Sequence, residues 1–176
     1  IVADSNHRLR RAVKAMVKAE PVANRKKRRG LRGRHLRLAW RRSRYAADCS
    51  PAAVNEWAAV VVAWEALARG GELCPSKSFD PSAPATPTRA DVTFERDKHG
   101  RTATLWLRPL KKRGKAREAK VPIVFAEHDG GGSDTYAALR RLCRYDPVPP
   151  AKAASTPLFR RANGSVMKLA HFTKIV

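Results

Sequence analysis

The chain has 176 residues, of which 37 are Lys or Arg and 15 are Asp or Glu, so its formal net charge is +22. This length allows one domain of ordinary size, or one small domain with a basic extension, and no apolar run is long enough to cross a bilayer. A folded domain with so much like charge repels itself, and a polyanion, usually nucleic acid, is the expected partner. Because the chain opens on Ile1-Val2-Ala3-Asp4, without Met or a signal peptide, we expect a fragment of a longer protein.

The charge is concentrated at the start of the chain, where residues 1–50 carry 16 Lys and Arg against 3 acidic residues. Apolar positions at helical spacing predict a basic amphipathic helix over 6–19, which Pro21 ends. The basic run that follows has no apolar anchor, and we expect it to lie along DNA as a linker, to act as a nuclear-localisation patch, or to be only a solvated tail. Its basic residues are Arg25, Lys26, Lys27, Arg28 and Arg29.

Residues 31–47 mix apolar and basic side chains without a clear period, so that either an extended stretch or a short helix is possible. The least basic part of the chain follows and predicts a buried helix from about Pro51 to Arg69. Ser50 is a suitable N-cap, and Pro51 is favourable at the first helical position. The expected apolar face consists of Trp57, Val60, Val61, Trp64 and Leu67.

Gly70 and Gly71 are expected to close this helix, which places Arg69 in its last turn. A cation is favourable there because the C-terminal end of a helix carries partial negative charge. The simplest interpretation of Arg69 is therefore a capping arginine.

Residues 74–90 contain four prolines and are expected to form a loop. Alternating apolar residues then predict strands over 91–95 and 102–107, joined by a turn at 97–100. A basic turn over 111–117 leads to a third strand over 119–124, which Pro122 identifies as an edge strand. The sequence thus predicts a mostly α chain with a small three-stranded antiparallel sheet, an α+β fold.

The last part of the chain predicts two more helices. The first is expected to be capped by Ser133 and to turn four residues inward, Tyr136, Leu139, Leu142 and Cys143. Pro157-Leu158-Phe159 and a turn at Asn163-Gly164 follow. A final helix is expected to open near Ser165.

Conventional catalytic motifs are absent from the sequence. It has no Gly-rich phosphate loop, no nucleophile motif of a hydrolase, and no Cys or His pair at metal-ligand spacing, so that no cofactor and no metal site are expected. The five histidines are scattered, and the tyrosines Tyr45, Tyr136 and Tyr145 are interpreted as packing residues. Candidate chemistry is therefore limited to arginine and lysine acting on a phosphate.

The order of elements resembles the catalytic domain of tyrosine recombinases, the phage-integrase family. That family's first motif reads approximately Gly-Leu-Arg-x-x-Glu-Leu, and Leu67-Ala68-Arg69-Gly70-Gly71-Glu72-Leu73 resembles it, with Arg69, Glu72 and Leu73 in place and Ala68 where the Leu before Arg is usual. Leu107-Arg108-Pro109-Leu110-Lys111 resembles the family's lysine turn as it occurs in recombinases of DIRS-like retroelements. Val121-Pro122 and Pro157-Leu158-Phe159 also match.

The resemblance implies DNA strand cleavage and rejoining through a 3′-phosphotyrosine, without a cofactor or a small-molecule substrate. Arg69 would then bind the nonbridging oxygens of the scissile phosphate, and Lys111, or Lys112 beside it, would be the general acid. Glu72 is expected to orient Arg69 or its neighbouring backbone. The family's second box, His-x-x-Arg, and its nucleophilic tyrosine are expected after Phe172 and are not found, so that this chain alone should bind DNA without cleaving it.

On this interpretation residues 1–30 are the end of a helical DNA-clamping domain with its basic linker, and residues 31–176 are the N-terminal part of the catalytic domain. Further DNA contacts are expected from the basic turn, at Lys112, Arg113 and Lys115. The expected partners are double-stranded DNA and other copies of the chain assembled on it, in recombination or integration of a mobile element. Localisation would be nuclear in a eukaryote and cytoplasmic otherwise. The alternative is a non-catalytic basic nucleic-acid-binding protein, such as a ribosome-associated subunit.

Overall fold

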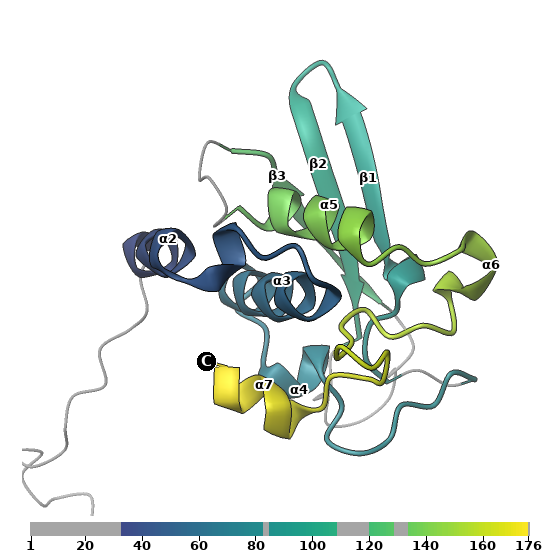
Figure 1. The fold of residues 1–176 in the computed structure, drawn as a ribbon. Coiled ribbons are helices and arrows are strands. Elements are labelled where there is room, and N and C mark those ends of the chain that lie inside the picture. The colour runs from purple at the N-terminus through teal and green to yellow at the C-terminus, as the bar shows by residue number, and fades with distance from the viewer. Residues whose placement is uncertain (1–32, 83–84, 109–119, 129–133, 176) are drawn as a thin grey trace, which may run out of the picture. The chain divides into compact units, whose positions relative to one another are not determined.

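A three-stranded sheet packs against one helix, and that helix packs against the longest helix in the described part of the chain (Figure 1). The computed structural model describes residues 33–82, 85–108, 120–128 and 134–175. The predicted helix over 6–19, the basic run over 25–29 and the basic turn over 111–117 lie outside these residues. The prediction of a mostly α chain with a small three-stranded antiparallel sheet is confirmed.

The sheet has the order β1-β2-β3, with β1 at Val92–Asp97, β2 at Gly100–Leu107 and β3 at Val121–Ala126. Both pairings are antiparallel, with Val92 opposite Leu105 and Leu107 opposite Val121. The predicted turn between β1 and β2 is confirmed. The Asp97 Oδ1 atom accepts hydrogen bonds from the backbone N–H groups of His99 and Gly100, at 2.8 and 3.0 Å.

The helix α3 spans Pro51–Glu65 and starts as the sequence predicts, with Ser50 Oγ accepting from the N–H of Ala53. Its end was predicted wrongly. Leu67 has φ +50°, and the N–H groups of Leu67 and Ala68 donate to the carbonyls of Trp64 and Ala63. These two bonds form a Schellman motif in which Leu67 occupies the position where glycine is usual. The helix therefore ends before Arg69, and Leu67, predicted to be buried, is 87% exposed.

Gly70 and Gly71 belong to a second, short helix, α4 at Gly70–Leu73. The predicted apolar face of α3 is correct for Trp57 and Val61, which are buried, while Val60 and Trp64 are only partly buried. The buried surface of α3 is wider than predicted because several small side chains of this helix are buried as well. They include Ala53, Val54, Ala58, Ala59 and Val62.

Residues 33–42, for which the sequence left two possibilities, form a helix, α2 at Gly33–Arg42, and a short 3-10 helix, η2, follows at Arg44–Ala46. Leu36 is buried, and the Trp40 ring lies 5.2 Å from the Trp57 ring. The Tyr45 ring centroid lies 5.4 Å from that of Trp57. Aromatic packing therefore holds α2 and η2 against α3.

The helix α5 at Thr135–Tyr145 contacts both β2 and β3. Its N-cap is Asp134, one residue later than predicted, because the Asp134 Oδ1 atom accepts from the N–H of Tyr136 at 2.8 Å. Tyr136, Leu139 and Leu142 are buried as predicted, whereas Cys143 is exposed.

A 3-10 turn, η3 at Arg89–Asp91, precedes β1, and a short helix, α6 at Pro150–Ala153, follows α5. The predicted turn at Asn163-Gly164 is confirmed, with Gly164 at φ +78°. The last helix, α7 at Leu169–Ile175, starts four residues later than predicted. Residues 165–168 are extended instead, because the N–H of Met167 donates to the carbonyl of Phe159. Among the described helices, none combines the length and apolarity that a bilayer span requires.

Candidate functional site

Arg69 is the N-cap residue of α4, directly after the Schellman motif that ends α3. Its backbone N–H donates to Glu72 Oε2 at 2.8 Å, as expected for a glutamate that orients the backbone beside Arg69. Its side chain is exposed, and no described residue forms a hydrogen bond or ion pair with the guanidinium. The prediction that Arg69 caps the C-terminal end of a helix is therefore wrong.

The position that Arg69 occupies does not favour an arginine for helix stability. N-cap side chains stabilise a helix by accepting a hydrogen bond, and a guanidinium has donors only. The N-terminal end of a helix also carries partial positive charge, which repels a cation. The free charge of Arg69 is thus available to a ligand.

The α7 helix packs directly against α4. A Cβ atom on Gly70 would lie 2.8 Å from Leu169 Cδ1 and 3.1 Å from Phe172 Cδ1, so that only glycine allows this approach. The N–H of Leu169 also donates to the carbonyl of Pro75, just after α4, at 3.0 Å. The backbone that carries Arg69 is therefore fixed by residues a hundred positions away in the sequence.

A cavity of about 200 Å³ lies between the turn that carries Arg69, which we call the Arg69 turn (residues 66–72), and the loop end of the β2–β3 hairpin. It is lined on one side by Ala66, Leu67, Ala68 and Glu72, and on the other by Leu107, Arg108, Val121 and Ile123. The chain enters the predicted basic turn at Arg108 and leaves it at Lys120, whose Nζ pairs with the buried Asp91. Both ends of the basic turn therefore lie at the end of the sheet that faces the Arg69 turn.

Among the predicted site residues, Arg69 is the one that the structure describes. The others lie outside the described residues, and they are Arg25, Lys26, Lys27, Arg28, Arg29, Lys111, Lys112, Arg113 and Lys115.

A buried polar cluster, which the sequence did not indicate, lies on the other side of α3. Asp146 accepts from Asn55 Nδ2 at 2.8 Å and from Arg89 at 2.6 Å, and it also pairs with Arg160. The Asn55 Oδ1 atom accepts from the backbone N–H of Arg160 at 2.7 Å. The cluster of these four residues joins α3, η3, the end of α5 and the loop before α7.

The charges of this cluster depend on one another. Burial lowers the pKa of Arg89, and the charge of Asp146 opposes that effect. Burial alone would raise the pKa of Asp146, but hydrogen bonds from Asn55 and Arg160 and the charges of Arg89 and Arg160 hold it below its usual range. The negative charge of Asp146 therefore compensates the positive charges of Arg89 and Arg160.

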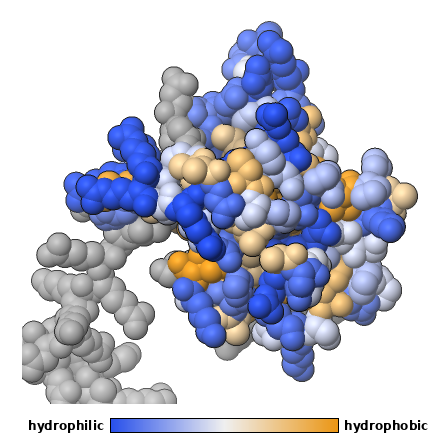
Figure 2. Space-filling view, viewed as in Figure 1, coloured by the Kyte–Doolittle hydropathy of each residue, from blue (hydrophilic) through white to orange (hydrophobic). Residues whose placement is uncertain are grey.

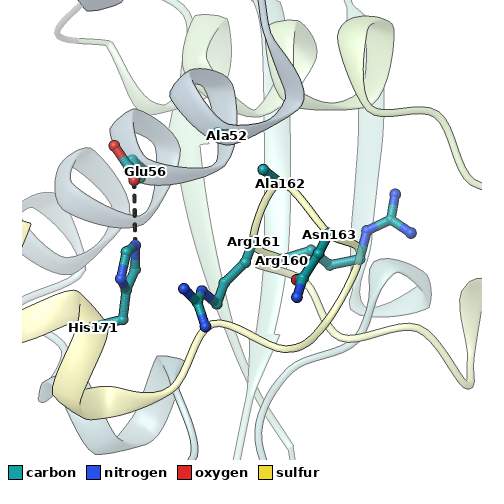
Figure 3. A pocket seen from close by; sticks show the side chains of 7 residues that line it. All are labelled: Ala52, Glu56, Arg160, Arg161, Ala162, Asn163 and His171. Atoms are coloured by element: carbon teal, nitrogen blue, oxygen red, sulfur yellow. Dashed lines mark hydrogen bonds and ion pairs between the residues drawn. The ribbon is translucent and has the colours of Figure 1, made fainter.

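Next to this cluster, Glu56 on α3 joins α7 to η2. It accepts from Arg44 at 3.0 Å and from Tyr45 Oη at 3.1 Å, and it lies 3.2 Å from His171 Nε2 on α7 (Figure 3). Glu56 and His171 line a cavity of about 230 Å³, which Arg161 and Asn163 also line (Figure 3). His171 thus has a polar contact and serves to attach α7.

A comparison with protein-family models, with curated proteins and with solved structures finds no match to this chain.

Proposed function

We propose that this chain is the DNA-binding first part of a tyrosine recombinase, in which Arg69 stabilises the scissile phosphate and Lys111, or Lys112 beside it, protonates the leaving group. The observation that carries the proposal is the position of Arg69. It is exposed at a rigid turn where an arginine brings no benefit to the helix that it precedes. Its backbone is fixed by Glu72, the glutamate of the same motif.

The position of the residues that flank the loop between β2 and β3 also supports the proposed roles of Arg69 and the lysine. Arg108 lines one cavity together with Ala68 and Glu72, so that the segment that carries the basic turn starts beside the Arg69 turn. Two motifs that are about 40 positions apart in the sequence are therefore neighbours in the fold. A phosphate site needs such a neighbourhood, because the groups that bind the nonbridging oxygens and the group that protonates the leaving oxygen must reach one phosphorus.

The reaction that these residues would serve is a transesterification. A tyrosine oxygen of the full-length protein attacks the phosphorus, the bond to the 5′ oxygen breaks, and a 3′-phosphotyrosine forms. Arg69 donates two parallel hydrogen bonds to the nonbridging oxygens as negative charge develops on them. The lysine gives its proton to the departing 5′ oxygen. The later attack of a 5′ hydroxyl on the phosphotyrosine reverses these transfers and rejoins DNA.

Covalent trapping tests this proposal in the full-length protein. A duplex with a nick just 3′ of the cleavage site loses the short fragment that carries the free 5′ hydroxyl after cleavage, and it should therefore accumulate a covalent protein–DNA adduct on a denaturing gel. Arg69→Ala and Arg69→Lys should slow adduct formation by about 10²–10³-fold, because neither residue can form the two parallel hydrogen bonds. Their affinity for DNA should change much less, since one of many phosphate contacts is lost.

Arg161→Ala provides the matched control, because Arg161 is another exposed arginine on a loop beside a short helix. It should form the adduct at the rate of the unmodified protein. An adduct that forms equally fast in Arg69→Ala would contradict the catalytic role of Arg69. Salt-sensitive DNA binding without any adduct in the full-length protein would favour the alternative, a non-catalytic nucleic-acid-binding protein.

A further inference from the structure

Two neighbouring segments of the fold carry arginine as their only charged residue type. Residues 33–47, which include α2 and η2, and the helix α5 contain eight arginines and no Lys, Asp or Glu. Six of these side chains are exposed and are not ion-paired with described residues. They are Arg34, Arg37, Arg41, Arg42, Arg140 and Arg144, and we refer to them as the α2–α5 arginine surface. Figure 2 shows α2 as a strongly hydrophilic part of the molecular surface.

Arg141 connects the two segments to each other. Its guanidinium donates to the backbone carbonyls of Tyr45 and Asp48, the latter at 2.9 Å, and lies 5.0 Å from the Trp40 ring centroid. Because Arg141 is used in this way, it fixes α5 against the end of α2. The exposed arginines of α2 and α5 are consequently carried by neighbouring segments that Arg141 connects.

An open groove of about 650 Å³ lies between α5 and the end of the sheet that includes Arg101. Arg140, Arg144 and Tyr145 line it from α5. Its one acidic lining residue, Glu127, already pairs with Arg101 at 3.3 Å. The groove therefore keeps an excess of positive charge that no described carboxylate compensates.

We propose that the α2–α5 arginine surface binds the phosphate backbone of duplex DNA, as a contact separate from the Arg69 turn; this inference rests on the proposed function. Arginine matches phosphate with two parallel hydrogen bonds, and a surface that carries arginines and no carboxylate suits an electrostatic contact with the DNA backbone. Arg101, near the start of β2, lines the groove, and Arg108, just after the end of β2, lines the cavity beside Ala68 and Glu72, so these two residues are about 23 Å apart along the strand. This distance corresponds to about seven base pairs of one duplex.

The experiment measures how the affinity of this chain for duplex DNA depends on salt and on duplex length. Two double variants remove the surface, Arg37→Gln with Arg41→Gln on α2, and Arg140→Gln with Arg144→Gln on α5. Each should reduce the slope of log K against log salt by about two, one for each lost phosphate contact. The loss should be present with a duplex of about 30 base pairs and smaller with a hairpin duplex of about 5, whose length of about 17 Å cannot reach both sites.

Lys77→Gln with Lys152→Gln is the matched control, because it removes the same charge from exposed positions outside the surface. It should leave the slope nearly unchanged. Arg140 also packs over the Phe94 ring at 5.3 Å, so the α2 variant, which has no such contact, separates lost binding from altered folding.

Three outcomes would overturn the inference. If both double variants bind DNA like the control, the surface is not a DNA contact, while the proposed function stands. If the unmodified chain does not bind duplex DNA at all, the inference and the proposed function both fail. If the double variants lose binding to RNA or to polyglutamate but keep their affinity for DNA, the surface serves a different partner.

Discussion

Asp146 is the carboxylate at the centre of the buried polar cluster. It is bound by Asn55, Arg89 and Arg160, and the Arg89 side chain is only 5% exposed. A buried guanidinium that loses its carboxylate keeps its charge, since its pKa is far above neutral, and it then lacks compensation. Single residues of this cluster should therefore matter more for stability than any exposed ion pair of the described chain.

Asp146→Asn should lower the free energy of unfolding by about 3–5 kcal/mol, as measured by urea denaturation. Glu127→Gln is the control, because its ion pair with Arg101 is 48% exposed at the arginine and 41% at the glutamate. An exposed pair of this kind contributes less than about 1 kcal/mol. Equal losses of unfolding free energy in the two variants would show that the buried cluster stabilises the fold no more than an exposed ion pair does.

The same carboxyl predicts a dependence on pH. Because its pKa is lower in the folded state than in the unfolded chain, the unfolded chain binds more protons in acid. The stabilisation is complete above the ordinary carboxyl pKa of about 4 and is lost as the pH falls through that value towards the folded-state pKa. Acid titration of stability should be shallower in Asp146→Asn than in the unmodified chain.

Leu67 is a residue whose substitution should increase the stability of the fold. It adopts φ +50° and is 87% exposed, so it has a strained backbone without the benefit of burial. Leu67→Gly should raise the free energy of unfolding by up to about 1 kcal/mol, and Leu67→Val should lower it, because a β-branched side chain tolerates this region least. Thermal unfolding of both variants would show this order, and the reverse order would contradict it.

At the level of elements, the sequence predicted what depends on local patterns. The alternation in β1 and β2, the Asp97 turn and the Ser50 cap all act between near neighbours, and each is confirmed. The end of α3 was missed because Leu67 forms a Schellman motif that the sequence suggests for Gly70. The start of α7 was missed because the distant Phe159 carbonyl binds the N–H of Met167 and keeps the preceding residues extended.

In the functional-site region too, the sequence predicted the residues of one local motif and missed those that are far apart in the chain. Arg69 and Glu72 belong to one short motif, so their sequence sufficed to nominate them. The Asp146 cluster joins residues between 14 and 105 positions apart, and no local pattern announces it. A single signal was present, since Asn55 is a polar residue in the mostly apolar helix α3, where the structure buries it fully. A buried asparagine needs partners for its amide, which could have prompted the search.

The contact between α4 and α7 can be tested at Gly70. Gly70→Ala should destabilise the fold by about 1–3 kcal/mol, because the added methyl group overlaps Leu169 and Phe172. The double variant Gly70→Ala with Leu169→Ala removes one of the overlapping side chains and should recover part of the loss in urea unfolding. If the second substitution only adds to the damage, the two helices are not in the described contact.

For the whole molecule, the net charge of +22 sets how it responds to salt. Like charges repel in the folded state more than in the expanded chain, and salt screens this repulsion. The thermal midpoint of the free chain should therefore rise between low and moderate salt, over the same range in which DNA binding weakens. Removing Arg37, Arg41, Arg140 and Arg144 should reduce this rise. A midpoint that falls with salt would indicate that ion pairs, and not repulsion, dominate.

The Asp146 cluster also has a consequence for the kinetics of folding. Its members come from α3, η3, the end of α5 and the loop before α7, so it can form only when these segments have assembled. Contacts that close such long loops are costly before the rest of the fold is in place. Asp146→Asn should accordingly accelerate unfolding and leave the refolding rate nearly unchanged, which stopped-flow measurements in urea would show. One carboxylate would then control how long the folded chain persists, without affecting how fast it forms.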